Sequence, residues 1–256
     1  MNVETVTQQL RALRLSTCAT EIEDVLQREK KAVNLSWFST LLERELDARR
    51  EKALTLRIKQ AKFPEITTLE QFDFSFNPKL SEERIRELFT LDFVKQRQIA
   101  LFLGQPGTGK THLALALGVE AARAGMKVYC TSVKRLAKDI RVARVGHRLD
   151  SLFKQMLSAK LWILDDWGVV SMDKEVTEEV FDLLDRRKHH CALVLTSNRA
   201  VHEWNEVFPD AILASATLDR LFEQAKVVTF AGQSYRLRGR IESKLVDGSL
   251  ETSQKE

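Results

Sequence analysis

The sequence predicts an α/β protein in which a mainly parallel β-sheet lies between helices and follows a small all-helical N-terminal domain. Short apolar runs alternate with helical patterns from residue 99 onward, which is typical of a parallel sheet with helices on both faces. A glycine-rich loop joins the first of these apolar runs to the helix that follows it. The first 62 residues are polar and glycine-free, and their apolar side chains recur at helical spacing.

Length and composition fit one α/β domain with a small accessory domain. The chain has 256 residues, and 44% of them are hydrophobic, which is ample for a core. No apolar window approaches the roughly 18 residues that span a bilayer. The N-terminus lacks the apolar core of a signal peptide, and the three cysteines are isolated, as expected of reduced thiols. We therefore expect a cytoplasmic protein without a membrane partner.

The predicted N-terminal domain covers residues 1–65. Apolar residues between Leu10 and Leu26 mark short amphipathic helices, and a longer helix begins near Ser36, which can cap it. Basic residues in the later part of this helix favour a solvated face with ion pairs. Phe63 and Pro64 end the helix, and residues 67–76 read as an extended linker with an aromatic cluster.

The predicted second domain covers residues 66–245. A helix is expected over residues 81–93, and another over residues 211–222. Strands are expected near residues 99–103, 127–131, 161–165, 192–196 and 227–230. Residues 246–256 are polar and are predicted to be disordered.

The glycine-rich loop predicts a phosphate-binding site. An apolar run precedes it and a helical pattern follows it, which is the strand–loop–helix context of a P-loop. Its glycines allow backbone N–H groups to point at phosphate oxygens, Lys110 adds a positive charge, and the Thr111 hydroxyl can bind Mg²⁺. The alternative is a glycine-rich turn that matches by accident, which the flanking elements disfavour. The predicted nucleotide-binding residues are Gly104, Gln105, Pro106, Gly107, Thr108, Gly109, Lys110, Thr111 and His112.

Two further strands end in polar side chains. Asp165 and Asp166 follow the apolar residues of the third predicted strand, and Asn198 follows the fourth. Beside a P-loop, we expect Asp165 to hold Mg²⁺ through water and Asp166 to orient or deprotonate the attacking water. Asn198 is suited to hydrogen-bond the γ-phosphate and that water. The open alternatives are that the two acids cap the turn at Gly168 and that Asn198 only forms a turn.

A basic segment lies between the second and third predicted strands, over residues 133–156. Only Asp139 and Asp150 oppose its positive charges, and Gly146 suggests a bend between two helices. Four of its basic residues follow the spacing of one helical stripe, at positions 134, 138, 141 and 148. Such a stripe suits contact with DNA phosphates, whereas the alternative is an ordinary solvated helix. The predicted DNA-binding residues are Lys134, Arg135, Lys138, Arg141, Arg144 and Arg148.

Taken together, these motifs resemble AAA+ ATPases of the clade that contains DnaA, DnaC and the insertion-sequence transposition helpers. The sequence is most similar to the IstB-like ATP-binding proteins. The resemblance covers residues 1–240 and rests on residues 104–113, 165–168, 196–198, Trp204, 207–210, 218–221 and 232–238.

The resemblance implies an AAA+ core behind a helical N-terminal domain, without a C-terminal lid domain. It implies an ATPase that uses ATP and Mg²⁺ and assembles into a ring or helical filament on double-stranded DNA near the bacterial nucleoid. It implies a transposase as partner, and Arg220 as the arginine that completes a neighbouring subunit's site. The alternative for Arg220 is a surface ion pair. Rival functions are a DnaC-like helicase loader, a small-molecule kinase and a passive architectural DNA binder.

One residue departs from the family pattern. Relatives usually carry Asp-Glu where this chain has Asp165-Asp166, and the shorter side chain predicts slow turnover. Two assignments stay open at this point. Arg236 is a candidate second phosphate sensor, and Phe72 and Phe74 contact the adenine or close the edge of the core.

Overall fold

The computed structural model describes residues 3–28 and 33–236 of the chain. The chain divides into two compact units, Met1–Leu56 and Arg57–Glu256. This division falls inside a long helix, α3 (Ser36–Ala61), whereas the predicted boundary at residue 65 follows that helix. The predicted tail, 246–256, and the last matched positions, 237 and 238, lie outside the described residues. Within the described ranges, no helix is long and apolar enough to cross a membrane.

The first unit contains α1 (Val3–Ala12), α2 (Ser16–Arg28) and the beginning of α3. Its core joins the apolar faces of the three helices through Val6, Leu10, Leu13, Ala19, Leu35 and Leu42. A buried polar pair ties α1 to α3, because Ser39 Oγ donates to Gln9 Oε1 at 2.9 Å and Gln9 Nε2 donates to the Ser39 carbonyl at 3.3 Å. The predicted all-helical character of this part is therefore correct.

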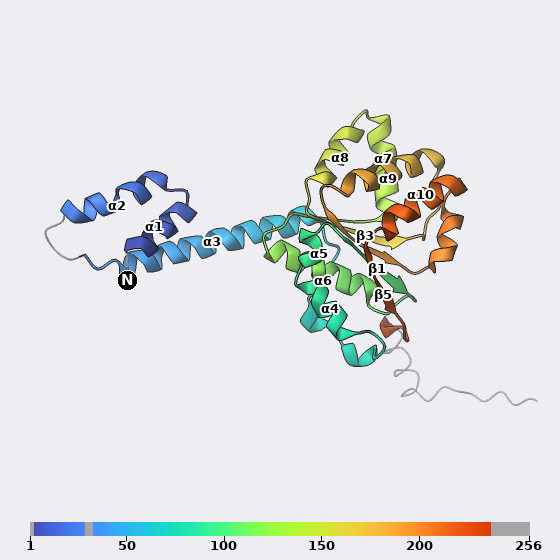
Figure 1. The fold of residues 1–256 in the computed structure, drawn as a ribbon, viewed down its shortest axis with the longest axis horizontal. Helices are drawn as coiled ribbons and strands as arrows, with labels where there is room; N and C mark the ends of the chain where they lie inside the picture. The colour runs from blue at the N-terminus through green and yellow to red at the C-terminus, as the bar shows by residue number, and fades with distance from the viewer. Residues whose placement is uncertain (1–2, 29–32, 237–256) are drawn as a thin grey trace, which may run out of the picture. The chain divides into compact units, whose positions relative to one another are not determined.

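The second unit is built on a five-stranded parallel sheet, which confirms the predicted fold class (Figure 1). The strands are β1 (Ile99–Gly104), β2 (Val128–Ser132), β3 (Leu161–Trp167), β4 (Ala192–Ser197) and β5 (Ala225–Phe230). Their order is β2-β3-β4-β1-β5. Because β4 pairs in parallel with both β1 and β3, the carboxyl ends of these three strands lie next to one another at the same end of the sheet.

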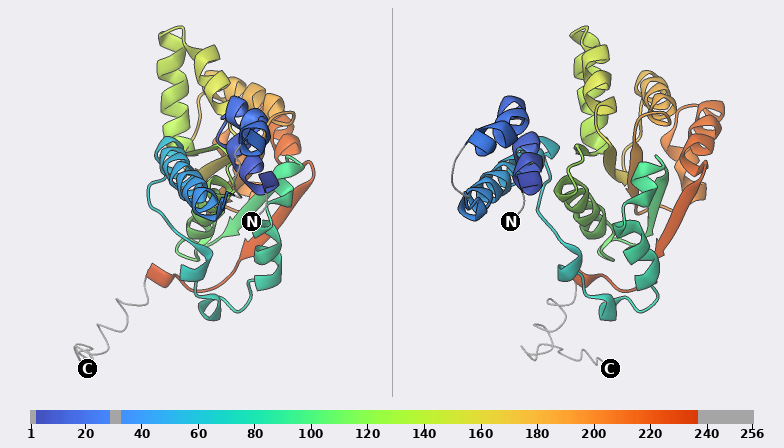
Figure 2. Two further views of the ribbon diagram at one scale, coloured as in Figure 1. Left: turned by 90° about the vertical axis from the view of Figure 1, so that its left-hand side faces the viewer. Right: turned by 60° about the vertical axis from the view of Figure 1, so that its left-hand side comes forward.

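Helices cover both faces of the sheet (Figures 1 and 2). One face packs against α6 (Lys110–Arg123), with α4 (Glu82–Phe89) beside it. The other face packs against α7 (Val133–Val145), α8 (Leu149–Leu157), α9 (Lys174–Arg187), the 3-10 helix η3 (Val201–Val207) and α10 (Ala211–Phe222). Strands buried on both faces are typical of parallel sheets and explain the continuous apolar runs in the sequence.

Three local features differ from the expectations. The helix expected over residues 81–93 is two helices, α4 and α5 (Asp92–Lys95), because Leu91 adopts a left-handed conformation with φ of 61°. The expected linker contains two short 3-10 helices, η1 (Leu69–Gln71) and η2 (Phe74–Phe76). Strand β3 continues past Asp165 to Trp167, with an irregularity in its pairing with β4 between Leu164 and Trp167.

Candidate nucleotide-binding site

The loop between β1 and α6 forms one side of a cavity at the edge of the sheet. Helix α6 begins at Lys110, and the residue before it, Gly109, has φ of 94°, a conformation that favours glycine. Gly104 approaches the backbone of β5 so closely that an added Cβ would lie 2.0 Å from the Phe230 carbonyl oxygen. The glycines thus permit a tight turn that leads into a helix N-terminus, where anions bind favourably.

Asp165 lies at the end of β3 and accepts two hydroxyl hydrogen bonds. Thr111 Oγ1 from α6 donates to Asp165 Oδ1 at 2.8 Å, and Thr196 Oγ1 from β4 donates to the same oxygen at 2.5 Å. A hydroxyl and a carboxylate are hard oxygen ligands of the kind that Mg²⁺ prefers. Thr111 and Asp165 are therefore a chemically suitable pair to hold Mg²⁺, which stays a prediction.

Asp166 is held in a strained backbone conformation beside Asp165. Its φ of 62° lies in the left-handed region, and its N–H donates to Thr196 Oγ1 at 3.1 Å. Its carboxylate accepts a hydrogen bond from Asn198 Nδ2 at 3.2 Å. Burial and the neighbouring Asp165 carboxylate raise the pKa of Asp166. The predicted catalytic acid and the predicted sensor amide are therefore in direct contact.

Lys110 is buried in the same cavity. Its Nζ donates to the Gln105 carbonyl at 2.7 Å, and the residue is 4% exposed. Burial lowers the pKa of Lys110 to about 8, against the opposing effect of Asp166 and Asp165. A negatively charged triphosphate in the cavity would restore the charged ammonium form.

The cavity has a volume of about 300 Å³, which is within the range of small-molecule sites. Of the predicted site residues, those at 106–112, Asp165, Asp166 and Asn198 line it, and so does Arg236. Gly104 and Gln105 are not part of the lining: the first packs on β5 and the second holds Lys110 through its carbonyl. The cavity is also lined by six residues that the sequence motifs do not indicate, namely Glu65, Gln71, Asp73, Phe76, Asn77 and Tyr235.

The two phenylalanines considered for adenine contact differ in position. Phe72 lines the cavity and packs on the phosphate loop, because a Cβ added at Gly109 would lie 2.4 Å from its ring. Phe74 is outside the lining and packs edge-on against Phe72, with ring centroids 4.9 Å apart. His112 is tied to the same segment, since its Nε2 lies 3.1 Å from the Thr68 carbonyl oxygen.

The C-terminal part of the described chain closes another side of the cavity. The Tyr235 N–H donates to the Gly107 carbonyl at 2.9 Å, and a Cβ added at Gly107 would collide with Ser234. The Tyr235 ring meets Phe76 edge-on at 5.1 Å. Arg236 follows in sequence and lies close enough to influence the pKa of both Lys110 and Asp166. Its proximity keeps it as a candidate phosphate-binding residue.

Arg220 lies on α10, away from the cavity lining of its own chain. Its Nε forms an ion pair with Asp185 Oδ1 of α9 at 2.7 Å, and the side chain is 41% exposed. The surface ion pair considered from the sequence therefore exists, with Asp185 as the partner instead of the neighbouring Asp219. Such an exposed pair is weak and leaves the guanidinium free to be recruited.

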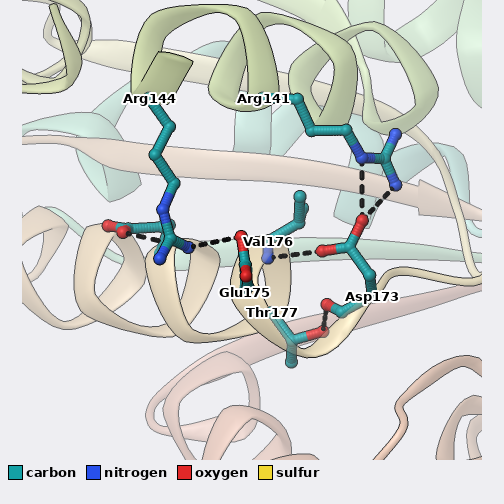
Figure 3. A network of polar contacts seen from close by, with 7 residues as sticks. Arg141, Arg144, Asp173, Glu175, Val176 and Thr177 are labelled. Carbon is teal, nitrogen blue, oxygen red and sulfur yellow. Dashed lines mark hydrogen bonds and ion pairs between the residues drawn. The ribbon is translucent and has the colours of Figure 1, made fainter. Parts of the chain in front are cut away.

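The basic segment forms α7 and α8, with the expected break at Gly146. Two of its predicted DNA-binding residues are paired with acids at the N-cap and in the first turns of α9 (Figure 3). Arg141 contacts Asp173 at 2.7 Å, and Arg144 lies 3.2 Å from Glu175 and 3.9 Å from Glu179. The expectation that this segment lacks compensating acids is therefore wrong, because a helix distant in sequence supplies them.

The expected single basic stripe is also interrupted. Arg148 precedes α8 and lies beyond the end of α7, so its spacing from Lys134 does not place it on the same helix face. Arg135 lies 3.9 Å from Asp139 on its own helix. Across residues 3–28 and 33–236, Lys134, Lys138 and Arg148 are exposed and have no ion-pair partner. Of the six predicted DNA-binding residues, these three are therefore the most available cations.

A phosphate loop beside two strand-end acids and a strand-end amide, on a sheet of this order, defines an AAA+ ATPase of the P-loop class. Solved structures agree with this fold. AMPPCP-bound DnaA from Aquifex aeolicus has a TM-score of 0.55 and 22% identity, with 74% of this chain and 57% of that chain covered. DnaI has a TM-score of 0.52 and 20% identity, with 66% of this chain and 89% of that chain covered.

Sequence relatives narrow the class to a family. The model of the IstB-like ATP binding protein family matches residues 8–243. The insertion sequence IS21 ATP-binding protein of Pseudomonas aeruginosa is 38% identical over 231 residues, covering 90% of this chain and 87% of the relative. The corresponding protein of insertion sequence IS5376 from Geobacillus stearothermophilus is 37% identical over 198 residues, covering 77% and 79%. The chain belongs to the IstB-like ATP-binding family.

Proposed function

We propose that this protein is an ATPase whose ATP-bound copies assemble on double-stranded DNA and recruit or stimulate a partner transposase. Hydrolysis of ATP then releases the assembly from DNA. The observation that carries the proposal is the contact between Asp166 and Asn198 beside Asp165, Thr111 and Lys110. It supports the proposal because it places an amide suited to sense the γ-phosphate beside residues suited to bind a nucleotide. The names of the relatives, which are ATP-binding proteins of insertion sequences, support the link to transposition.

Each polar group of the site has a role in this proposal. Lys110 neutralises the β- and γ-phosphates. Thr111 and Asp165 would hold Mg²⁺, which would supply further positive charge to the phosphates. Asp166 orients or deprotonates the attacking water, and Asn198 aligns that water with the γ-phosphate. Arg220 of a neighbouring copy supplies positive charge to the transferring phosphoryl group, which couples hydrolysis to assembly.

The proposed DNA contact is made to the phosphate backbone by the α7–α8 region. Lys134, Lys138 and Arg148 are available for it, whereas Arg141 and Arg144 must first leave acids of α9. Contacts to phosphates alone give binding that is sensitive to salt and tolerant of sequence. One fold neighbour supports contact of this clade with nucleic acid, namely DnaA bound to AMPPCP and single-stranded DNA, at a TM-score of 0.54. In a bacterial cell, such binding would place the protein at the nucleoid.

Electron microscopy of the protein on long duplex DNA tests the proposal. We expect large assemblies with ATP and few with ADP or without nucleotide. The matched control is Lys110→Ala, which removes the phosphate-binding charge and should leave the protein dispersed with ATP. Dispersed protein under every nucleotide condition, or equal assembly by Lys110→Ala, would refute ATP-driven assembly.

The rival function of a helicase loader shares the same core. The crystal structure of the DnaC helicase loader has a TM-score of 0.51 and 19% identity to this chain, a likeness that concerns the fold. Pull-down with the two candidate partners separates the functions. Retention of a transposase encoded beside the gene supports the proposal, and retention of the replicative helicase alone supports the rival.

A further inference from the structure

The cavity has a second end that the phosphate chemistry does not use. Lys110, Asp165 and Asp166 fix where a triphosphate would lie, and the remaining lining comes largely from residues 71–77 and from Tyr235. This part is rich in aromatic rings, since Phe72 lies on the phosphate loop and Phe76 meets Tyr235 edge-on. Aromatic and apolar surface of this kind suits a nucleobase.

Asn77 stands out in this lining because its side chain is buried and unpaired. The residue is 3% exposed, and within the described part of the chain neither Oδ1 nor Nδ2 has a hydrogen-bond partner. Its backbone is fixed independently: the Asn77 N–H donates to the Phe74 carbonyl at 3.1 Å, and its own carbonyl accepts from the Leu80 N–H at 2.9 Å. The local turn therefore does not depend on the amide side chain.

Burying an amide without partners is costly, because it loses hydrogen bonds to water and gains none. A buried polar group without partners, on a residue that lines a binding cavity, is explained when a ligand supplies the missing bonds. An amide offers one acceptor and two donors. Adenine offers the complement on one edge, an amino donor at N6 beside a ring-nitrogen acceptor, and asparagine pairs with adenine in this bidentate manner elsewhere.

We propose that Asn77 is a base-binding residue of the ATP site, in which its side-chain amide hydrogen-bonds the 6-substituted edge of the purine. This inference rests on the proposed binding of a nucleoside triphosphate in the same cavity. Because no described residue fixes which end of the amide carries nitrogen, a half-turn of the amide also suits guanine, with its O6 acceptor and N1–H donor. Asn77 therefore favours purines with a 6-amino or 6-oxo group over an unsubstituted purine.

The test uses Asn77→Leu, which keeps the branched shape and removes both polar atoms, with Asn205→Leu as matched control at an exposed position. Binding of ATP, purine riboside triphosphate (which lacks the 6-amino group) and inorganic triphosphate is measured on the full chain. We expect Asn77→Leu to weaken ATP binding by about 10-fold or more, given two lost hydrogen bonds. The loss for purine riboside triphosphate should be smaller, and inorganic triphosphate should bind as it does to the unaltered protein.

Thermal unfolding of the empty protein separates a binding role from a structural one. No bond is lost when an unpaired amide becomes apolar, so Asn77→Leu should unfold at the same or a higher temperature than the unaltered protein. Asn77→Ala, which cannot overpack the site, should show the same pattern of ligand losses. Unchanged ATP affinity, an equal loss for inorganic triphosphate, or a lowered unfolding temperature in both variants would overturn the proposal. An unaltered protein that binds neither ATP nor triphosphate would instead overturn the proposed function.

Discussion

At the scale of single residues, the site is defined by a buried lysine, Lys110, and a half-buried acid, Asp166, whose pKa values move in opposite directions. Burial lowers the pKa of Lys110 and raises the pKa of Asp166, and each charge partly offsets the shift of the other. Perturbed groups that face one another in a cavity are typical of functional sites. A bound triphosphate would stabilise the charged form of Lys110 and raise its pKa again.

The lowered pKa of Lys110 predicts how ATP affinity depends on pH. In the empty protein this lysine loses its proton near pH 8, and a bound triphosphate raises its pKa again. Binding therefore takes up a proton above about pH 8, so ATP affinity should fall as pH rises from 8 to 10, by at most about tenfold per pH unit. Isothermal titration with ATP across this range measures the slope.

Lys110→Arg provides the control for this pH dependence, because arginine keeps its charge throughout the range. This variant should bind ATP more weakly than the unaltered protein, and its affinity should not change between pH 8 and 10. The same linkage affects the free energy of unfolding of the empty, unaltered protein. This free energy should increase as pH rises from 8 to 10, because Lys110 keeps its proton in the unfolded chain and loses it in the folded chain. An affinity that is constant with pH in the unaltered protein would contradict the assignment.

At the scale of elements, the parallel strands β3 and β4 align Asp165 and Asp166, the proposed metal-binding and catalytic acids, through a single buried hydroxyl. Thr196 is 1% exposed, donates to Asp165 and accepts from the N–H of Asp166. One side chain of β4 thereby orients the carboxylate at the end of β3 and holds the left-handed backbone that follows it. A side chain of the same shape that lacks the hydroxyl therefore cannot replace Thr196 in these two contacts.

Thr196→Val should remove both hydrogen bonds while keeping the shape of the side chain. The Asp166 N–H is then left without its partner, which should lower the free energy of unfolding by about 1–3 kcal/mol. The Mg²⁺ concentration for half-maximal ATPase should rise, because the Asp165 carboxylate loses a positioning contact. Urea unfolding and ATPase titrations measure the two effects. Thr196→Ser keeps the hydroxyl and should restore both, and a Val variant that matches Ser in both assays would refute this role.

Ion pairs connect helix α7 to the N-terminal part of α9. Asp173 Oδ1 caps α9 by accepting from the Val176 N–H, and its other oxygen accepts from Arg141 (Figure 3). The backbone hydrogen bond from Val176 and the Arg141 side chain hold the pKa of Asp173 below its usual value. Arg141 thus already has a partner, whereas Lys138 of the same helix has none among the described residues.

This difference predicts unequal effects on DNA binding. Lys138→Ala should weaken binding to duplex DNA more than Arg141→Ala and should reduce the dependence of log affinity on log salt concentration by about 0.9 per lost phosphate contact. Lys79→Ala, an exposed lysine outside this region, serves as control. Fluorescence anisotropy at several salt concentrations measures both quantities. Equal losses from Lys79→Ala and Lys138→Ala would exclude a specific role for α7.

At the scale of the whole molecule, the ATP site lies entirely in the second compact unit, and its strand order gathers the functional residues. Arg220 is on the same unit but outside the cavity of its own chain. That position is what an arginine needs if it is to serve a neighbouring copy, because its guanidinium is partly exposed and only weakly held.

Mixing two inactive variants tests this arrangement. Arg220→Ala binds ATP but offers no arginine to a neighbour, and Lys110→Ala binds no ATP but still offers its arginine. Each should hydrolyse ATP slowly alone, and an equimolar mixture with DNA should recover a substantial part of the activity. The reference mixture is Arg220→Ala with the double variant Lys110→Ala/Arg220→Ala, which should recover none. Equal rates in the two mixtures would show that Arg220 does not act between copies.

The sequence by itself determined the parts of this protein whose chemistry is local. The phosphate loop, the apolar strands and the polar residues that follow them are each contiguous in the sequence, so Lys110, Asp165, Asp166 and Asn198 could be predicted as parts of one P-loop site. The five strands and the break at Gly146 follow from the same local patterns.

Tertiary structure alone decided what depends on segments distant in the chain. It paired Arg141 and Arg144 with acids of α9, which no count of charges within residues 133–156 could show. It turned the expected linker into a wall of the cavity and placed Asn77 and Tyr235 in that wall. The physical reason is that burial and ion pairing depend on which surfaces meet after the sheet closes, whereas strand, loop and helix propensities act over a few neighbouring residues.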